Sequence, residues 1–374
     1  MSENTIGIPQ SASAVVCELN PLHDGHRFVI QEAGSNADIT VAVMSGNFTQ
    51  RTEPALFDKY TRAAMALSAG ADLVVELPFP WSCMGAEGYA SAGVHIASCL
   101  GCTSMTFGSE CGDRGILEKA ADIKDSERFA EAQKLTEARF PETGSAGIFD
   151  TVMSELGLGC SLGRNDKLGT EYILAARKRG IGSCNIVKRD PGLMSASVIR
   201  ELYLREGPAS AERHIPAEAR GIFEAAEPVD PGFFDGYLFL MCRLARDTEG
   251  ILSHASKVAR RSRDAREFAE GLPTKKYTLS RIKRELFFSF TGASGLEGDP
   301  LYTVLLGADG KGREFLAGKR KECRMPVITK PSDVSGLSEA ARAQYGLLNI
   351  SDEIYTLGMK KEAGHFMTRG PVII

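Results

Sequence analysis

The stretch Asn20-Pro21-Leu22-His23-Asp24-Gly25-His26 decides the fold of this chain. It follows an apolar run at 14–17, Ala-Val-Val-Cys, that predicts a strand, and it precedes a helical pattern at 27–33. Two histidines three residues apart therefore lie on a strand-to-helix turn. The first turn of a helix offers unpaired N–H groups and a partial positive charge, so it binds phosphate readily. Gly25 allows a ligand to approach the backbone closely.

The imidazoles of His23 and His26 could donate hydrogen bonds to the oxygens that join the α- and β-phosphates of a nucleotide. Donors at these oxygens would stabilise the charge that develops when pyrophosphate leaves. Two other interpretations stay open from these seven residues. Zinc is disfavoured, because helical metal pairs are usually spaced i, i+4 and no third ligand lies at a useful spacing, so no bound metal is expected here. A purely structural turn is the other.

Composition and length describe an ordinary globular protein. The chain has 374 residues, which favours about two domains, with 43% hydrophobic and 25% charged residues. No apolar run approaches the ~20 residues that span a bilayer, so no membrane association is expected. Met1-Ser2-Glu3-Asn4 lacks the basic start and apolar stretch of a signal peptide, which makes the cytoplasm the expected location.

Nine cysteines are scattered without a disulfide pattern, which fits reduced thiols. Cys99 and Cys102 form a CxxC, but the pair falls between a predicted helix and a strand. A redox pair favours a helix N-terminus, so two buried structural thiols are the better interpretation.

The first half alternates strand and helix signals. Short apolar runs with β-branched residues predict strands at 13–18, 39–44, 73–77, 105–107 and 185–188. Helical patterns lie between them at 27–33, 58–69, 86–99 and 115–138. This alternation predicts an α/β fold with a Rossmann-like, doubly wound parallel sheet, whose ligands bind beyond the carboxyl ends of the strands. We assign residues 1–210 to this catalytic domain.

After about residue 207 the strand signals fade. Helices are predicted at 216–226, 236–246, 253–270 and 280–290, so residues 211–374 form a mainly α-helical C-terminal domain. The formal net charge is -4, yet residues 255–330 hold 17 Lys and Arg against 9 Asp and Glu. A basic segment on an acidic protein indicates a local polyanion-binding surface, although a solvated helical face explains it equally well.

Several segments converge on the predicted crevice. Residues 45–47 (Ser-Gly-Asn), 108–110 (Gly-Ser-Glu) and Arg189 all follow predicted strands. A further helix opens after the fifth strand, at 194–200, where Ser195 or Ser197 could cap it and Arg200 adds a charge one turn in. Capping alone would explain the serines. A capped helix start with an arginine one turn in, on a chain that also has the histidine turn, points more specifically to an anion-binding site.

These features resemble the nucleotidyltransferases of the HIGH superfamily, whose motifs are HxGH and a late Ser/Thr-rich segment that ends in Ile-Arg. A closer resemblance is to the tRNA(Met) cytidine acetate ligases. It covers nearly the whole chain, most strongly before residue 110 and most weakly across 115–160 and 210–270. It is carried by residues 16–26, 43–51, 53–55, 58–59, 107–110, 165–172, 188–189, 195–200, 277–282 and 326–330.

The resemblance implies that ATP and acetate form acetyl-adenylate, and that the acetyl group passes to N4 of the wobble cytidine of elongator tRNA(Met). It implies ATP contacts along 16–29 and at Gly108, Asn165 and Arg189. With the strand-end and helix-start residues, the predicted ATP site comprises Val16, Cys17, Glu18, Leu19, Asn20, Pro21, Leu22, His23, Asp24, Gly25, His26, Arg27, Phe28, Val29, Gly108, Asn165, Lys188, Arg189, Ser195 and Ser197.

The chain departs from the family in small ways. Leu19 and Leu22 replace the usual aromatic residues, and Asp24 replaces an asparagine. Because Asp24 adds negative charge beside a phosphate site, we expect it to point away. Asn165 could contact the nucleotide, but Asn165-Asp166 would also serve as a helix N-cap.

His23, His26, Lys188 and Arg200 are the expected catalytic groups, and Mg²⁺ is expected to assist. An exposed strand end is the alternative explanation for Lys188 and Arg189. Position alone suggests Ser45, Asn47 and Gln50 around acetate. Residues expected to hold tRNA are Tyr277, Arg281, Arg284, Arg313, Lys319, Arg320 and Lys321.

Two other functions stay open. A nucleotidyltransferase could adenylate a small phosphorylated cofactor precursor, although the helical half would then be surplus. A nucleotide-sensing or RNA-binding module without turnover is the other, against which the intact histidines and glycine argue. The sequence leaves the oligomeric state open.

Overall fold

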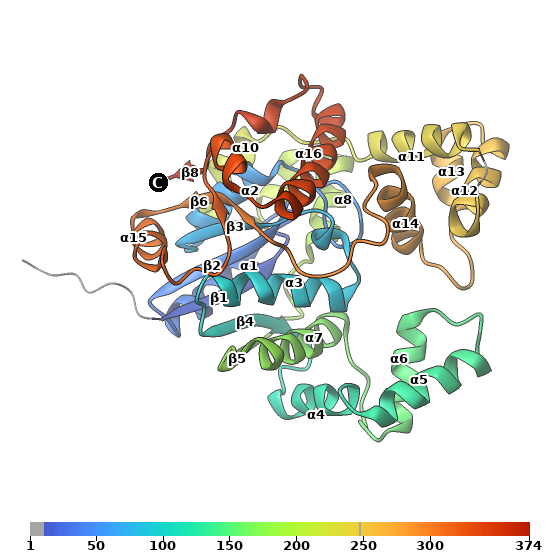
Figure 1. Ribbon diagram of the computed structural model, residues 1–374, viewed down its shortest axis with the longest axis horizontal. Helices are drawn as coiled ribbons and strands as arrows, with labels where there is room; N and C mark the ends of the chain where they lie inside the picture. The colour runs from blue at the N-terminus through green and yellow to red at the C-terminus, as the bar shows by residue number, and fades with distance from the viewer. Residues whose placement is uncertain (1–10, 247) are drawn as a thin grey trace, which may run out of the picture.

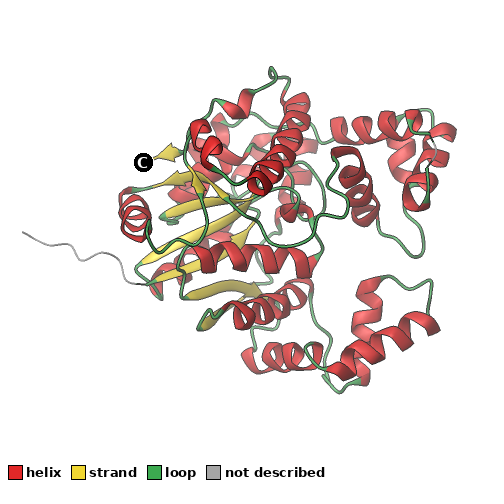
Figure 2. Cartoon of the chain, in the orientation of Figure 1, coloured by secondary structure: helices red, strands yellow, loops and turns green. Residues whose placement is uncertain are grey.

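The computed structural model describes residues 11–246 and 248–374, which form an eight-stranded sheet. Helices cover both faces of this sheet (Figures 1 and 2). The signal-peptide prediction at residues 1–4 lies outside the described residues. The strand order is β5-β4-β1-β2-β3-β6-β7, and β8 also pairs with β6. The strands are β1 (Ala12–Cys17), β2 (Ile39–Ser45), β3 (Leu73–Leu77), β4 (Ser104–Ser109), β5 (Ser183–Lys188), β6 (Thr303–Ala308), β7 (Val327–Ile328) and β8 (Val372–Ile373).

The first five strands are parallel and lie close to their predicted positions. Strands β1, β2 and β3 are buried along their whole length, which explains why they read as continuous apolar runs. The α/β, Rossmann-like fold is therefore confirmed. Their carboxyl ends meet at one edge of the sheet, which we call the carboxyl edge.

The C-terminal region adds strands that sequence analysis missed. Strand β6 pairs antiparallel with β3, and β7 and β8 pair parallel with β6. The fading of strand signals after residue 207 was therefore misleading, and the sheet is mixed rather than purely parallel. Segments from both sides of residue 210 share this sheet. The division of the chain into two domains near that residue stays a prediction.

Two hydrophobic clusters cover the two faces of the sheet. One face packs against α1 and α2 and against C-terminal helices, and the other packs against α3, α4, α7 and α15. The helices of the first half are α1 (Asp24–Ser35), α2 (Lys59–Ser68), α3 (Ala86–Cys99), α4 (Arg114–Lys124), α5 (Glu127–Arg139), α6 (Ser145–Glu155) and α7 (Arg164–Arg179). Cys99 and Cys102 are both buried thiols in this packing.

Helices dominate the rest of the chain. They are α8 (Ala196–Glu206), α9 (Pro208–Glu212), α10 (Arg220–Ala225), α11 (Gly232–Leu244), α12 (Gly250–Arg261), α13 (Ala265–Gly271), α14 (Leu279–Thr291), α15 (Gly310–Lys319) and α16 (Glu339–Met359). Short 3₁₀ turns lie at Trp81–Cys83, Ala217–Ala219, Pro331–Gly336 and His365–Met367. No described helix is long and apolar enough to cross a bilayer.

Two predicted helices are each divided in the structure. The stretch 115–138 forms α4 and α5, because Ser126 caps the second of them through the N–H of Phe129. The stretch 253–270 forms α12 and α13, because the Asp264 side chain caps α13 through the N–H of Glu267. Side-chain oxygens that satisfy free N–H groups start a new helix at both points.

A buried arginine joins the ends of the two central strands. Arg62 of α2 is 0% exposed and donates from Nη1 to the carbonyls of Glu18 (2.7 Å) and Ser45 (3.0 Å). Its Nη2 donates to the carbonyl of Gly46, and its Nε donates to Phe57 at 2.9 Å. The carbonyls of Glu18, Ser45 and Gly46 lie where β1 and β2 end, and that of Phe57 lies just before α2. One guanidinium thus satisfies backbone groups of two strand ends and a helix start.

We predict that Arg62→Met lowers the free energy of unfolding by about 3 kcal/mol or more, because four buried carbonyls lose their donor. The matched control is Arg266→Met, since the Arg266 side chain is 89% exposed and forms an ion pair with Glu270 one turn along α13. Urea unfolding followed by circular dichroism measures both. Equal unfolding free energies for the two variants would contradict the role given to Arg62.

Candidate functional site

The turn from β1 to α1 is fixed by its own buried side chains. Leu19 has a left-handed backbone (φ 48°), and both Leu19 and Leu22 are fully buried. The peptide bond between Asn20 and Pro21 is cis. The Asn20 side chain accepts a hydrogen bond from the N–H of Leu56 at 2.8 Å. The two leucines that depart from the family pattern therefore serve the core.

The two histidines stack at the first turn of α1. Their ring centroids lie 3.8 Å apart with an interplanar angle of 28°. His23 is the N-cap residue, and its Nδ1 accepts from the N–H of Gly25 at 3.0 Å. A Cβ on residue 25 would lie 2.8 Å from Cε1 of His23, so only glycine leaves this ring in place.

Both rings favour the neutral form. Burial, together with the smaller effect of the Arg189 charge, lowers the pKa of His23 to about 4. Burial also lowers the pKa of His26 well below its usual value, with further lowering by His23 and Arg189. Because the Nδ1 of His23 accepts a hydrogen bond, its neutral tautomer carries the proton on Nε2. The site thus offers an N–H donor rather than a fixed positive charge.

The ends of β4 and β5 border the same turn. The N–H of Arg189 donates to the carbonyl of Ser109 at 2.8 Å, which extends the pairing of these strands by one residue. Arg189 then lies 3.9 Å from the Glu110 carboxylate, and its charge acts on both histidines. Lys188 is exposed at the end of β5. Gly108 passes beside α1, where a Cβ would lie 3.7 Å from Val29.

The start of α7 is held by carboxylates, which shows whether Asn165 is the cap of this helix. The N-cap residue is Gly163, and the Asp166 carboxylate accepts from its N–H at 3.0 Å. Asp166 also accepts from Ser109 Oγ at 2.5 Å. The N–H of Asn165 donates to Glu110 at 3.2 Å. The capping task therefore falls to Asp166, and Asn165 stays a prediction for nucleotide contact.

Helix α8 reaches the turn through Arg200. Its Nη1 donates to the carbonyl of Asn20 at 2.6 Å, and its Nη2 lies 3.5 Å from Ser197 Oγ and 4.0 Å from Glu53. Ser195 is the N-cap residue, but its side chain makes no capping hydrogen bond. Capping therefore does not explain Ser195, while Arg200 is joined directly to the histidine turn.

The rest of the predicted stretch 16–29 divides into core and surface. Val16 and Cys17 are buried, and burial raises the pKa of the Cys17 thiol to about 12. Asp24 pairs with Arg27 at 3.0 Å, so its negative charge is neutralised on α1 itself. Phe28 is 58% exposed.

The predicted acetate residues already have protein partners. Ser45 Oγ lies 3.2 Å from the Tyr89 hydroxyl. Asn47 donates to Asp352 at 2.8 Å and accepts from the N–H of Lys59 at 2.9 Å, and the chain buries it almost completely. These bonds belong to the core, so Ser45 and Asn47 hold the strand end rather than line an open pocket.

Gln50 is held beside the turn by its backbone. Its N–H donates to the Glu18 carboxylate at 2.8 Å, and its carbonyl accepts from Arg284 at 3.2 Å. Burial raises the pKa of Glu18. Gln50 is thus the one of the three predicted acetate residues that is only partly buried.

The residues predicted for tRNA fall into separate places. Tyr277 stacks under Arg281 at 4.9 Å at the start of α14, while the Arg284 side chain turns inward to the carbonyls of Cys83 and Gln50. The others lie on or after α15, which packs at the opposite, amino edge of the parallel strands (Figure 1): Arg313, Lys319, Arg320 and Lys321. The structure therefore does not bring the predicted tRNA residues together.

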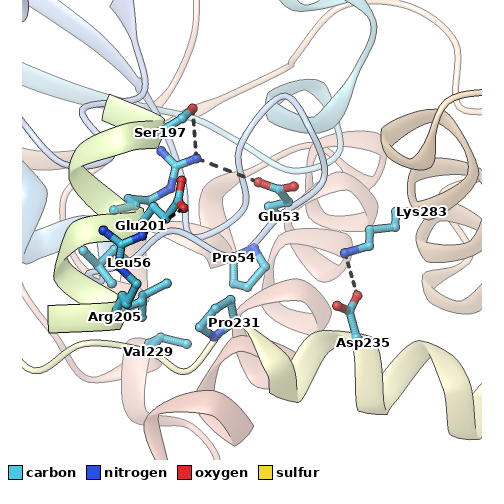
Figure 3. A pocket seen from close by; sticks show the side chains of 12 residues that line it. Glu53, Pro54, Leu56, Ser197, Glu201, Arg205, Val229, Pro231, Asp235 and Lys283 are labelled. Atoms are coloured by element: carbon cyan, nitrogen blue, oxygen red, sulfur yellow. Dashed lines mark hydrogen bonds and ion pairs between the residues drawn. The ribbon is translucent and has the colours of Figure 1, made fainter. Parts of the chain in front are cut away.

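Sequence analysis missed several residues around the turn. Arg62, which holds the strand ends, gave no signal, while Glu110 and Asp166 lay in segments that the sequence pointed to but without their role of holding α7 beside β4. Glu53 borders Arg200 and lines a cavity of about 500 Å³ alongside α8 (Figure 3). Sequence signals existed for two of its walls, the Glu-Pro-Ala segment at 53–55 and the helix start with Ser197 and Arg200, but its other walls come from distant helices.

Comparisons with known proteins agree with this geometry. The chain matches the HIGH Nucleotidyl Transferase family over residues 10–368. The tRNA(Met) cytidine acetate ligase of Syntrophotalea carbinolica is 33% identical over 365 residues, covering 86% of this chain and 85% of that protein. The enzyme of the same name from Kosmotoga olearia is 31% identical over 396 residues, covering 94% and 92%.

Solved structures give the same result. Thermotoga maritima TmcAL bound with alpha-thio ATP superposes with a TM-score of 0.86 at 27% identity, covering 98% of this chain and 100% of that one. The apo form of the same protein also gives 0.86, at 26% identity and the same coverage. With the stacked histidine turn, the parallel sheet and matches along nearly its whole length, the chain belongs to the HIGH nucleotidyltransferase family and, within it, to the tRNA(Met) cytidine acetate ligases.

Proposed function

We propose that this protein uses ATP to activate acetate as acetyl-adenylate, and then transfers the acetyl group to N4 of the wobble cytidine of elongator tRNA(Met). As a member of its family the chain is an ATP-dependent ligase that forms a carbon–nitrogen bond. The observation that carries the proposal is the stacked pair of neutral histidines at the start of α1. Its expected location is the cytoplasm, where ATP, acetate and tRNA meet.

In the first step an acetate oxygen attacks the α-phosphorus of ATP, and the bond to the bridging oxygen breaks to release pyrophosphate. The α1 N-terminus attracts the phosphates, and the Nε2–H of His23 donates to the oxygen that leaves. The neutral ring already carries this donor N–H, and a proton drawn onto the ring by nearby phosphate strengthens the donor. Arg189 and Lys188 supply the positive charge that lets two anions meet.

Magnesium is proposed to accompany the triphosphate. The described residues contain no cluster of three or more His, Cys, Asp or Glu side chains able to hold a metal ion. The Asp166 carboxylate is already filled by protein donors. Mg²⁺ commonly keeps its waters and binds through substrate phosphates, so this donor set fits an ion carried by ATP. The ion would neutralise phosphate charge, while the residues above orient the reactants.

In the second step N4 of cytidine attacks the acetyl carbon. The carbon–oxygen bond to AMP breaks, AMP leaves with the electron pair, and the nitrogen loses one proton to water. Because adenylate is a good leaving group, holding the two reactants together supplies most of the acceleration. Acetate itself is proposed to lie near Gln50, since Ser45 and Asn47 are engaged in the core.

We predict that His26→Ala abolishes acetate-dependent exchange of pyrophosphate into ATP while the protein stays folded. His26 packs on His23 and sets the position of the donor ring. The control is His254→Ala, because His254 lies in α12 and contacts Leu272. Radioactive exchange measures activity, and circular dichroism checks folding. Near-normal exchange by the folded His26 variant would refute the role in phosphate chemistry.

We predict that ATP binding draws a proton onto His23. The pKa of His23 is lowered to about 4 in the free protein, and nearby phosphate charge favours the protonated ring and raises this pKa. Affinity for ATP should therefore rise as the pH falls from about 6.5 to about 4.5, more in the wild type than in His23→Asn. Asparagine keeps the helix cap and removes the titrating ring.

Calorimetry in two buffers of different ionisation enthalpy counts these protons. Any proton taken up by ATP itself contributes equally to the uptake measured with both proteins, so it cancels in their difference. Equal proton uptake by the wild type and His23→Asn would show that phosphate does not lie beside this ring.

We predict that the triple change Lys319→Ala, Arg320→Ala and Lys321→Ala leaves pyrophosphate exchange unchanged and weakens tRNA binding. This cluster lies at the amino edge, away from the histidines, but a six-residue strand spans only about 20 Å and an RNA can contact both edges. The salt dependence of filter-binding affinity should become shallower, since fewer phosphates are neutralised. Identical tRNA affinity at moderate salt would remove this cluster from the RNA surface.

A further inference from the structure

A cavity of about 500 Å³ runs beside α8 (Figure 3), and Arg200, which bonds to the carbonyl of Asn20, is one of the residues that line it. We call it the α8 cavity. Its apolar walls come from three segments: the loop after β2, helix α8 and the start of α11. They are formed by Pro54, Leu56, Leu204, Val229 and Pro231. This volume falls in the range of small-molecule sites and is far larger than acetate requires.

The charged groups that line the α8 cavity balance one another. Lys283 pairs with Asp235 at 2.5 Å, and the Lys283 side chain is only 8% exposed. Arg205 lies 3.8 Å from Glu201, and Arg200 lies 4.0 Å from Glu53. Three cations thus face three carboxylates. A triphosphate or an RNA phosphate would meet as much repulsion as attraction, whereas a neutral ligand with both donors and acceptors fits.

One side chain of the α8 cavity, Arg200, also contacts the candidate active site. Arg200 donates to the carbonyl of Asn20, directly before the histidine turn, and its other nitrogen faces Glu53 and Ser197 in the cavity. Ser197 lies at the first turn of α8 and is itself one of the residues predicted for the ATP site. A ligand in the cavity therefore lies beside an acyl-adenylate held at the turn.

We propose that the α8 cavity receives the acceptor base, a cytosine swung out of an RNA loop. The inference rests on the proposed function and adds the place where the second substrate binds. Cytosine is neutral, and it carries a donor amine beside acceptors at N3 and O2. The Glu53 carboxylate accepts from the N4 amine, and Arg200 donates to the acceptor edge. Pro54, Leu56 and Leu204 cover the faces of the ring.

This arrangement gives the base its orientation. Glu53 lies on the Arg200 side of the cavity, so an amine bound to it points toward the turn that would hold acetyl-adenylate. A uracil in the same place would turn a carbonyl oxygen toward the carboxylate, which is repulsive. The pairing of Glu53 with Arg200 therefore favours cytosine over uracil and sets the attacking nitrogen toward the acetyl group.

The test fills the cavity and leaves the histidine turn intact. Leu204→Trp places an indole in the cavity from a residue that is 51% exposed, so the fold tolerates it. The matched control is Leu244→Trp, because Leu244 is also an exposed helical leucine (67%) and does not line the cavity. Acetate-dependent pyrophosphate exchange reports the first step. Acetylation of an elongator tRNA(Met) transcript reports the second.

We expect Leu204→Trp to keep wild-type exchange and to lose at least tenfold in acetyl transfer, while Leu244→Trp matches the wild type in both. Wild-type transfer by Leu204→Trp would overturn the proposal. Loss of exchange by folded Leu204→Trp would also overturn it, since the cavity would then belong to the nucleotide site. Absence of acetate-dependent exchange in the wild type itself would instead refute the proposed function.

A transcript with an abasic wobble position separates the base from the RNA backbone. Wild-type affinity should fall when the base is removed, and Leu204→Trp should bind the intact and abasic transcripts equally. If Leu204→Trp lowers the affinity for the abasic transcript as much as for the intact one, the cavity holds RNA backbone rather than a base, and the proposal fails.

A second variant, Glu53→Gln, keeps the shape of the side chain and removes its charge. We expect unchanged exchange and at least tenfold slower transfer to cytidine, and normal transfer would overturn the assignment of Glu53. This variant also answers the question if Leu204→Trp does not fold.

Discussion

The site depends on one buried guanidinium. Arg62 binds carbonyls at the ends of β1 and β2, so the histidine turn and the loop that follows β2 leave the sheet from fixed points. A buried charge destabilises the fold when any of its hydrogen-bond partners is lost. The neighbouring start of α2 has the same character, because Lys59 pairs with Glu76 and Asp352 in the core. Helix α2 thus joins both central strands to α16.

Local sequence patterns were enough to find the first five strands. Each is a short apolar run buried on both faces. The helices between them are long enough to show the hydrophobic periodicity of an α-helix. Strand β6 has the same composition, Thr-Val-Leu-Leu-Gly-Ala, but it follows a long run of helices and pairs antiparallel. Strands β7 and β8 have two residues each, and so short a segment carries no periodicity.

The histidine turn was readable because its chemistry is contiguous in sequence. The residues around it were harder, since their roles depend on partners far along the chain. Asn47 looked like a pocket residue from its place after β2, yet its amide is bound to Asp352, 305 positions away. The pair Asn165-Asp166 looked like an N-cap, but the N-cap residue is Gly163, and the Asp166 carboxylate accepts from its N–H. A hydrogen bond between distant segments decides the first case, and no local pattern records it. The second case depends on a shift of two residues in where the helix begins.

The placement of β6 also bears on how the chain is made. Until residues 303–308 leave the ribosome, β3 has an unpaired side along Leu73, Val74 and Val75. An open, apolar strand border of this kind invites pairing with other chains. β3 therefore keeps an edge open to pairing with other chains until about the last fifth of the polypeptide is made, and the sheet that carries the histidine turn is complete only then.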